Sequence, residues 1–192
     1  MASSFYYLIG SLPNLQLGEP CPLTGNEFFG MCENFVSPDQ LKNLKDLSLV
    51  PRDNPCCSVE TAWNDFETDL RNWTVRIRSQ RSRRDGDTSI RPEGNLVASM
   101  ELHVTEALDQ KTPLDAERML DELRWQHLQD LSVSHEFDFA RLVIYRLQLA
   151  IIEKWTHHDA SEGLERLQNT VKLLQDSSNP AENGNDPESE TI

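Results

Sequence analysis

The side chains in this sequence that could bind a metal ion or act as a base include five histidines. His157 and His158 are adjacent, and a helix would direct neighbouring side chains about 100° apart, which makes the pair a poor chelate. We interpret this pair as residues that interact with the carbonyl groups at a helix C-terminus. His103, His127 and His135 lie apart, without the spacing of metal ligands. The sequence therefore predicts no metal site.

The four cysteines could act as nucleophiles, metal ligands or disulfide partners. Cys21, Cys32, Cys56 and Cys57 do not have the spacing of a zinc site, and the adjacent pair cannot easily bond to itself. A reduced cytosolic chain explains them best. We also find no glycine-rich phosphate loop and no serine or cysteine nucleophile motif. We therefore expect a protein without a catalytic residue, a metal ion or a cofactor.

A group of six arginines within fourteen residues supplies the candidate partner-binding residues: Arg71, Arg76, Arg78, Arg81, Arg83 and Arg84. Guanidinium groups form forked hydrogen bonds with carboxylates and phosphates. Three interpretations are open at this stage. The group is a solvated helix end that pairs with the acidic body, a docking patch for an acidic partner, or an RNA-binding surface on which Trp73 stacks a base.

The charge balance narrows the class of partner. The chain has 192 residues and a formal net charge of -14, which disfavours nucleic acid and anionic lipid unless the basic residues are segregated. The apolar run at residues 5–9 is far too short to span a bilayer, and no basic residue precedes it. We expect neither a signal peptide nor a transmembrane helix. The prediction is a cytoplasmic protein whose association with any membrane would go through its partners.

Helix signals dominate the first part of the chain. Thr24 with Glu27, and Ser37 with Gln40, have the spacing of capping boxes, and Pro38 suits a first helical position. A longer helix should follow Ser58 as its N-cap, because five apolar residues recur at spacings of 3, 4, 3 and 4: Trp63, Phe66, Leu70, Trp73 and Ile77. Residues 73–77 also alternate as a strand would, but the longer pattern favours a helix.

The second part of the chain is more uniformly helical. We predict four helices, over 93–108, over 112–131, over 138–155 and from Ser161 to about 174. Thr112 is the expected cap of the second helix, with Pro113 at its first position. Phe137 is the expected hydrophobic staple of the third helix. The helix at 138–155 is apolar on several sides, which indicates a central buried helix. The tryptophans, together with Tyr6 and Tyr7, are expected to pack inside.

The predicted fold is an all-α bundle of about seven helices. A short apolar segment at residues 5–12, either strand or helix, precedes it. The predicted organisation is a helical half at 1–84, a loop at 85–92, a second helical half at 93–175 and a disordered acidic tail at 176–192.

The opening of the chain, Tyr-Tyr-Leu-Ile-Gly-Ser-Leu-Pro at residues 6–13, resembles the start of a bacterial family of unknown function. Members of that family are typically encoded beside subunits of V/A-type ATPases, and they open with an aromatic pair, an aliphatic pair, a small residue and Ser-Leu-Pro. Further similar stretches are Pro22-Leu23 with Phe28-Phe29, the arginine-rich helix at 63–84, Glu117–Trp125 and Phe137–Trp155.

The same opening is similar to that of the C-type subunit of those rotary ATPases, an all-helical component between the central shaft and the membrane ring. The resemblance implies a central-stalk or assembly component without catalytic residues, whose partners are V/A-type ATPase subunits. A full C-type subunit is much longer, so this chain would be a reduced equivalent or an accessory factor. The alternatives are a helical adaptor unrelated to the ATPase and an RNA-associated protein that uses the same arginines.

Overall fold

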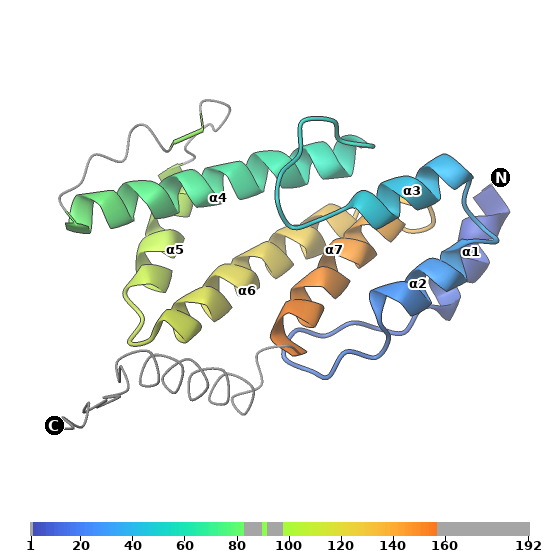
Figure 1. The fold of residues 1–192 in the computed structure, drawn as a ribbon, viewed down its shortest axis with the longest axis horizontal. Coiled ribbons are helices and arrows are strands. Elements are labelled where there is room, and N and C mark those ends of the chain that lie inside the picture. The colour runs from blue at the N-terminus through green and yellow to red at the C-terminus, as the bar shows by residue number, and fades with distance from the viewer. Residues whose placement is uncertain (1, 83–89, 92–97, 157–192) are drawn as a thin grey trace, which may run out of the picture. The chain divides into compact units, whose positions relative to one another are not determined.

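The computed structural model describes residues 2–82, 90–91 and 98–156. Regular structure in this part of the chain is entirely helical, which confirms the all-α prediction (Figure 1). None of these helices is long and apolar enough to cross a membrane. The seven helices are α1 (Ala2–Ser11), α2 (Gly25–Cys32), α3 (Pro38–Asp46), α4 (Ser58–Ser82), α5 (Ala98–Leu108), α6 (Pro113–Ser132) and α7 (Phe139–Thr156).

The predicted caps position the short helices α2 and α3. Thr24 N donates to Glu27 Oε2 at 2.7 Å, and Glu27 N donates back to Thr24 Oγ1 at 3.3 Å. Ser37 and Gln40 repeat this exchange at 3.0 and 3.2 Å. Each pair satisfies amide groups that the first turn of a helix leaves without a partner. Both capping boxes are therefore confirmed.

Three details differ from the sequence expectation. Residues 5–11 are helical and belong to α1, so the open choice between strand and helix is settled. Ser58 is the first residue of α4 and not its cap; Cys57 takes the cap position because its carbonyl accepts a hydrogen bond from Thr61 N at 3.1 Å. The helix predicted from Ser161 and the acidic tail lie outside the described residues. The described part of the chain has seven helices, one of which is α1.

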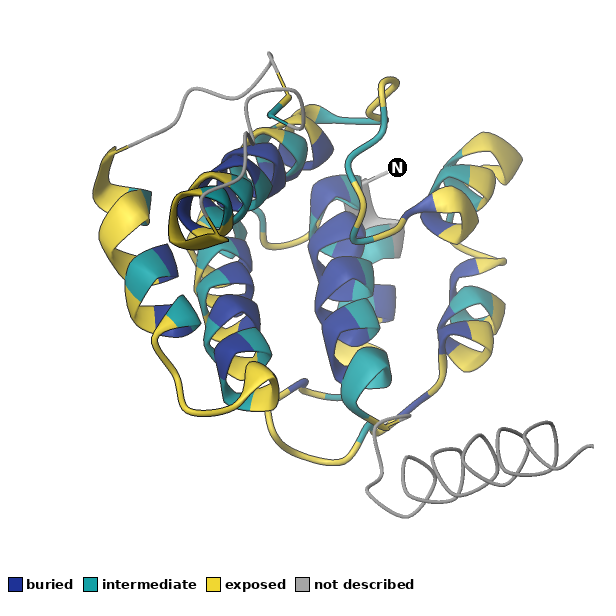
Figure 2. Cartoon of the chain, turned by 60° about the vertical axis from the view of Figure 1, so that its left-hand side comes forward, coloured by how far each residue is buried: buried dark blue, intermediate teal, exposed yellow. Residues whose placement is uncertain are grey.

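Helix α7 is the centre of the bundle. It contacts α1, α2, α3, α4 and α6, and Figure 1 shows it between α6 and the group formed by α1 to α3. Leu142, Leu147 and Ile151 are fully buried, and Figure 2 shows that the buried residues gather where the helices face one another. The prediction of a central buried helix at 138–155 is thereby confirmed.

Two hydrophobic clusters fill the interior. The larger cluster surrounds α7 and includes Trp63 of α4 and Leu128 of α6. The smaller cluster lies between α4, α5 and α6 and includes Leu70 and Leu120. The predicted halves at 1–84 and 93–175 both contribute residues to each cluster. The stripe on α4 thus serves both clusters, and the strand alternative for residues 73–77 is wrong.

A buried ionic network separates the two clusters. Glu67, on α4, lies one turn from Trp63 and one turn from Leu70, and it has no exposed surface. Arg124 of α6 reaches it through two hydrogen bonds, Nε to Oε2 at 2.8 Å and Nη2 to Oε1 at 3.0 Å. Such a forked pair satisfies both carboxylate oxygens and fixes the two helices against each other.

The network continues onto α7 through Asp121. Arg124 Nη1 donates to Asp121 Oδ1 at 2.7 Å. Lys154 Nζ and Trp155 Nε1, both on α7, donate to Asp121 Oδ2 at 2.9 and 2.8 Å. Burial by itself would lower the pKa of Arg124, but the carboxylates of Glu67 and Asp121 outweigh burial and raise it. Three helices are therefore joined by one network of charges, of which Glu67, Asp121 and Arg124 are buried and Lys154 is partly exposed.

Removal of one charge from this network should destabilise the fold strongly. In Arg124→Met the Glu67 carboxylate keeps only the Arg71 guanidinium, at 2.7 Å, so we expect the free energy of unfolding to fall by about 3 kcal/mol. Urea unfolding measures this. Glu122→Ala, an exposed position on the same helix, is the matched control and should change the value by less than about 0.5 kcal/mol. Equal effects of the two variants would contradict a role for the network in stability.

Candidate functional site

Among the described arginines of the group, Arg71, Arg76 and Arg81 make contacts within the chain. Arg71 pairs with the buried Glu67, and the guanidinium of Arg76 lies 5.4 Å from the ring centroid of Trp73. Trp73 is itself buried. Hydrogen bonding to a carboxylate and stacking on an aromatic ring both hold a guanidinium in place. Neither side chain is therefore an unattached surface charge.

Arg81 ties the end of α4 to the end of α5. Its Nη1 donates to the carbonyl oxygen of Leu108 at 2.8 Å, and its Nη2 donates to Asp109 Oδ1 at 2.6 Å. Arg78 is exposed, while Arg83 and Arg84 lie outside the described residues. In the described part of the chain, Arg76 and Arg78 are the members of the group that leave positive charge at the surface without a carboxylate partner.

The histidines in the described part of the chain lie at separate places. His127 is stacked on Phe66, with ring centroids 4.1 Å apart, and burial lowers its pKa. His135 Nδ1 lies 2.7 Å from Asp138 Oδ2, and His103 Nδ1 lies 3.0 Å from the carbonyl oxygen of Ser99. The described residues contain no group of three or more potential metal ligands. His157 and His158 lie outside them.

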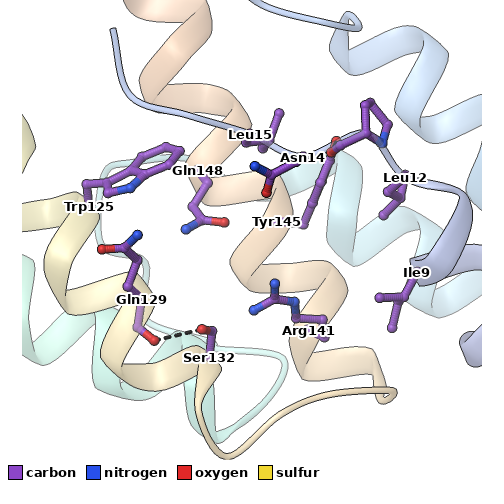
Figure 3. A pocket seen from close by; sticks show the side chains of 11 residues that line it. Ile9, Leu12, Asn14, Leu15, Trp125, Gln129, Ser132, Arg141, Tyr145 and Gln148 are labelled. Atoms are coloured by element: carbon purple, nitrogen blue, oxygen red, sulfur yellow. Dashed lines mark hydrogen bonds between the residues drawn. The ribbon is translucent and has the colours of Figure 1, made fainter. Parts of the chain in front are cut away.

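A cavity of about 320 Å³ opens between α1, α6 and α7 (Figure 3). Arg141 and Gln148 project from α7 towards Gln129 and Ser132 of α6, and the segment that follows α1 closes the other side. The cavity is lined by Ile9, Leu12, Pro13, Asn14, Leu15, Trp125, Gln129, Ser132, Arg141, Tyr145 and Gln148.

Residues 13–15, which follow α1, form one wall of the cavity, and Tyr145 holds this wall in place. Its hydroxyl donates to the carbonyl oxygen of Pro13 at 2.8 Å, and its ring stacks on Phe28 with centroids 5.4 Å apart. Burial raises the pKa of Tyr145, so the phenol keeps the proton that this hydrogen bond uses. The segment is thereby fixed to α7, and the same tyrosine ring also packs against α2.

The lining of the cavity offers several polar groups that can bind a partner. It offers amide and hydroxyl groups from Asn14, Gln129, Ser132 and Gln148, together with the guanidinium of Arg141. Such a lining can accept a carboxylate or an amide group of a partner. Sequence reasoning missed this cavity because its residues come from three distant segments without a common motif.

Helix α1 and the connection between α6 and α7 present an aromatic surface, which we define as Tyr6, Tyr7 and Phe137. Their exposed fractions are 56%, 71% and 42%. The ring centroids of Tyr6 and Phe137 lie 4.8 Å apart, and those of Tyr6 and Tyr7 lie 5.7 Å apart. The expectation that the two tyrosines pack inside is therefore wrong. They lie on the outer side of α1, whereas Leu8 on its inner side is buried against the core.

A match to a known protein family covers the second part of the chain. Residues 96–178 match the model of a family described as protein of unknown function (DUF2764). Within the described residues this range contains α5, α6 and α7 but not the opening helix α1. It includes Arg124 of α6, Arg141 of α7 and Phe137 in the connection between these two helices. No curated protein and no solved structure matches the chain.

The hydroxyl of Tyr145 should stabilise the cavity wall measurably. Tyr145→Phe keeps the stacked ring but leaves the Pro13 carbonyl without its donor, so we expect a loss of about 1 kcal/mol. For a chain of this size that corresponds to a fall in Tm of about 2–4 °C, measured by thermal unfolding. Tyr6→Phe removes a hydroxyl from an exposed ring and should leave Tm unchanged. An unchanged Tm for Tyr145→Phe would show that the wall does not depend on this hydrogen bond.

Proposed function

We propose that this chain is a non-catalytic subunit or accessory factor of a bacterial V/A-type ATPase, and that it binds a partner subunit through the aromatic surface. The observation that carries the proposal concerns the opening helix α1, whose sequence resembles the start of the ATPase-associated family. One side of this helix is buried and the other side is exposed. Leu8 is buried and anchors α1, while Tyr6 and Tyr7 are exposed. Packing against the core accounts for an apolar residue at position 8. It does not account for two aromatic residues at the exposed positions 6 and 7.

Exposed, clustered aromatic rings favour a protein interface. Tyrosine supplies a large contact area at a low entropic cost, and aromatic residues dominate the binding energy of many interfaces. In this chain the rings of Tyr6 and Phe137 already contact each other, so less side-chain freedom would be lost on binding. The neighbouring cavity adds Arg141 and several amides, which suit a carboxylate or a backbone amide of the partner.

The helical body suits a mechanical part. The buried charges join α4, α6 and α7, and Glu153 Oε1 of α7 accepts a hydrogen bond from Gly25 N at the start of α2, at 2.7 Å. Buried and satisfied polar contacts hold elements in one relative arrangement more firmly than apolar packing alone. A component between the shaft and the ring of a rotary ATPase needs this property, since it transmits force without chemistry of its own.

The arginine-rich end of α4 is a second contact surface in this proposal. Arg76 and Arg78 are exposed, and an acidic face of a partner subunit would complement them. Arg71 and Arg81 already pair with carboxylates, so fewer guanidinium groups are available for phosphates.

Co-purification from the native host tests the proposal. The tagged chain, isolated in mild detergent, should recover the catalytic-head, central-shaft and membrane-ring subunits of the ATPase in a fixed ratio. The double variant Tyr6→Ser, Tyr7→Ser should reduce that recovery at least about tenfold. Loss of an aromatic residue at the centre of an interface costs about 2 kcal/mol, and about 1.4 kcal/mol already corresponds to a tenfold lower affinity. Phe35→Ser is the matched control, since Phe35 is an exposed aromatic residue outside the aromatic surface.

The other outcomes are equally decisive. Loss of binding in Arg78→Glu but not in the tyrosine variant would place the contact at the end of α4 and reject the aromatic surface. Equal losses in the tyrosine variant and in Phe35→Ser would point to nonspecific adhesion. Recovery of no ATPase subunit, with the ATPase intact elsewhere in the lysate, would reject the ATPase proposal and leave a helical adaptor.

A further inference from the structure

The cavity between α1, α6 and α7 is lined by one face of α6 and one face of α7 (Figure 3). Each face contributes residues at positions i, i+4 and i+7, which share one side of a helix. These residues are Trp125, Gln129 and Ser132 of α6, and Arg141, Tyr145 and Gln148 of α7. The inward side of a helix is usually apolar, so the glutamines, the serine and the arginine need a physical explanation.

Gln148 is the lining residue that most requires a hydrogen-bond partner. It is only 8% exposed, and its side chain points from α7 into the cavity (Figure 3). Within residues 2–82, 90–91 and 98–156 its amide group has no hydrogen-bond partner. Buried amides are almost always hydrogen-bonded, because an amide that leaves water without a new partner loses free energy. An amide that is this buried and faces a cavity therefore indicates a partner from outside the chain.

Arg141 supplies the positive charge of the cavity. Its guanidinium is half-buried, and in the described part of the chain it makes no hydrogen bond, ion pair or ring contact. It is the charged residue among the eleven that line the cavity. The other arginines of α6 and α7 each have a partner within the chain, namely Arg118, Arg124 and Arg146. A guanidinium has five donors and no acceptor, so that of Arg141 requires an anion or several carbonyl oxygens.

The charge of the cavity favours a carboxylate over a phosphate. One guanidinium matches the single charge and the two oxygens of a carboxylate in a forked pair. A phosphate group brings more negative charge and a third acceptor oxygen. The chain has a net charge of -14, which disfavours the approach of a multiply charged anion. A ligand with one carboxylate is therefore the best match for Arg141.

The rest of the lining indicates what is attached to that carboxylate. The side-chain amides of Asn14, Gln129 and Gln148 can each donate and accept a hydrogen bond, as a peptide group requires. Apolar residues on the side of α1 and the segment after it can hold a hydrocarbon side chain; these are Ile9, Leu12, Pro13 and Leu15. A carboxylate, a peptide group and an apolar side chain occur together at the C-terminal end of a polypeptide.

The dimensions of the cavity agree with a chain end. Arg141 and Gln148 are seven residues apart on α7, which corresponds to about 10 Å along the helix axis. About three residues of extended chain span the same distance. The volume of about 320 Å³ is at the lower end of the range for ligand sites, about 300–1,000 Å³. A terminus can enter such a space, whereas an internal segment must both enter and leave it.

We propose that this cavity binds the C-terminal end of a partner chain whose last residue is apolar. The terminal carboxylate pairs with the guanidinium of Arg141, the adjacent peptide group exchanges hydrogen bonds with Gln148, and the last side chain packs against Leu12 and its apolar neighbours. Capture of a terminal carboxylate is a recurring mode of peptide recognition. The inference rests on the proposed function in that it assigns a partner to this end of the chain, and it adds the chemical class of the bound segment.

Calorimetric titration of the purified full-length chain with synthetic peptides tests the proposal. The probe is N-acetyl-Ala-Ala-Leu with a free carboxylate. Its C-terminal amide, and N-acetyl-Ala-Asp-Leu amide with a carboxylate only on a side chain, are the comparison peptides. The free acid should bind saturably, and both amides should bind about tenfold more weakly or worse, because a charge-assisted pair is lost. Inorganic phosphate at tenfold excess should not displace the free acid.

Variants of the two lining residues separate a binding role from a structural one. Arg141→Met should abolish the preference for the free acid over the amide, and Arg141→Lys should retain part of it. Gln148→Leu should weaken both peptides several-fold. Neither side chain has a partner in the described part of the chain, so neither variant should lower Tm. Lys42→Met removes a charge at an exposed position of α3 and is the matched control, with unchanged affinity.

Four results would overturn the proposal. They are equal affinity for the free acid and its amide, equal affinity for the peptide with the side-chain carboxylate, displacement by phosphate, and an unchanged preference for the free acid in Arg141→Met. These measurements need no ATPase, so the two failures are distinguishable. Recovery of ATPase subunits without peptide binding rejects this inference alone. Peptide binding that depends on Arg141, without recovery of ATPase subunits, rejects the ATPase proposal and supports the cavity as a site for a chain terminus.

Discussion

The ion pair between Glu67 and Arg124 is the constraint on which the arrangement of α4, α6 and α7 depends. Apolar packing alone tolerates small shifts of one helix along another. A buried carboxylate that moves away from its partner, in contrast, becomes a buried charge without compensation, which costs several kcal/mol, about 3–5. The pair lies between the two hydrophobic clusters and extends through Asp121 to Lys154 on α7. It thereby fixes α7, which in turn supports α1 and the cavity wall through Tyr145.

Local signals in the sequence were sufficient to predict most of the fold. The capping pairs at Thr24 and Ser37 and the apolar stripe of α4 depend on residues three or four positions apart, so they can be recognised without tertiary information. The conformation of residues 5–11 could not be decided in this way, because a short apolar run fits either a strand or a helix until it packs. The ionic network was equally hidden, since Glu67 and Arg124 are 57 positions apart.

The candidate site was less predictable than the fold. The arginines stood out by composition, yet composition cannot show that Arg71 pairs with Glu67 or that Arg81 pairs with Asp109. The cavity and the aromatic surface arise only where α1, α6 and α7 meet. Cys57 was recognised as one of an adjacent pair, but its cap position depends on where α4 begins, and helix ends are the least certain feature of a sequence-based prediction.

Site-specific photo-crosslinking in the native host tests the central claim most directly, namely that the aromatic surface contacts a V/A-type ATPase subunit. A photoreactive phenylalanine analogue replaces Tyr7 in one strain and Phe35 in another, and cross-linked products are identified by mass. The account predicts a product between position 7 and a single subunit of the central stalk or ring, and none from position 35. No ATPase subunit cross-linked to position 7, in cells whose ATPase is assembled, would contradict it.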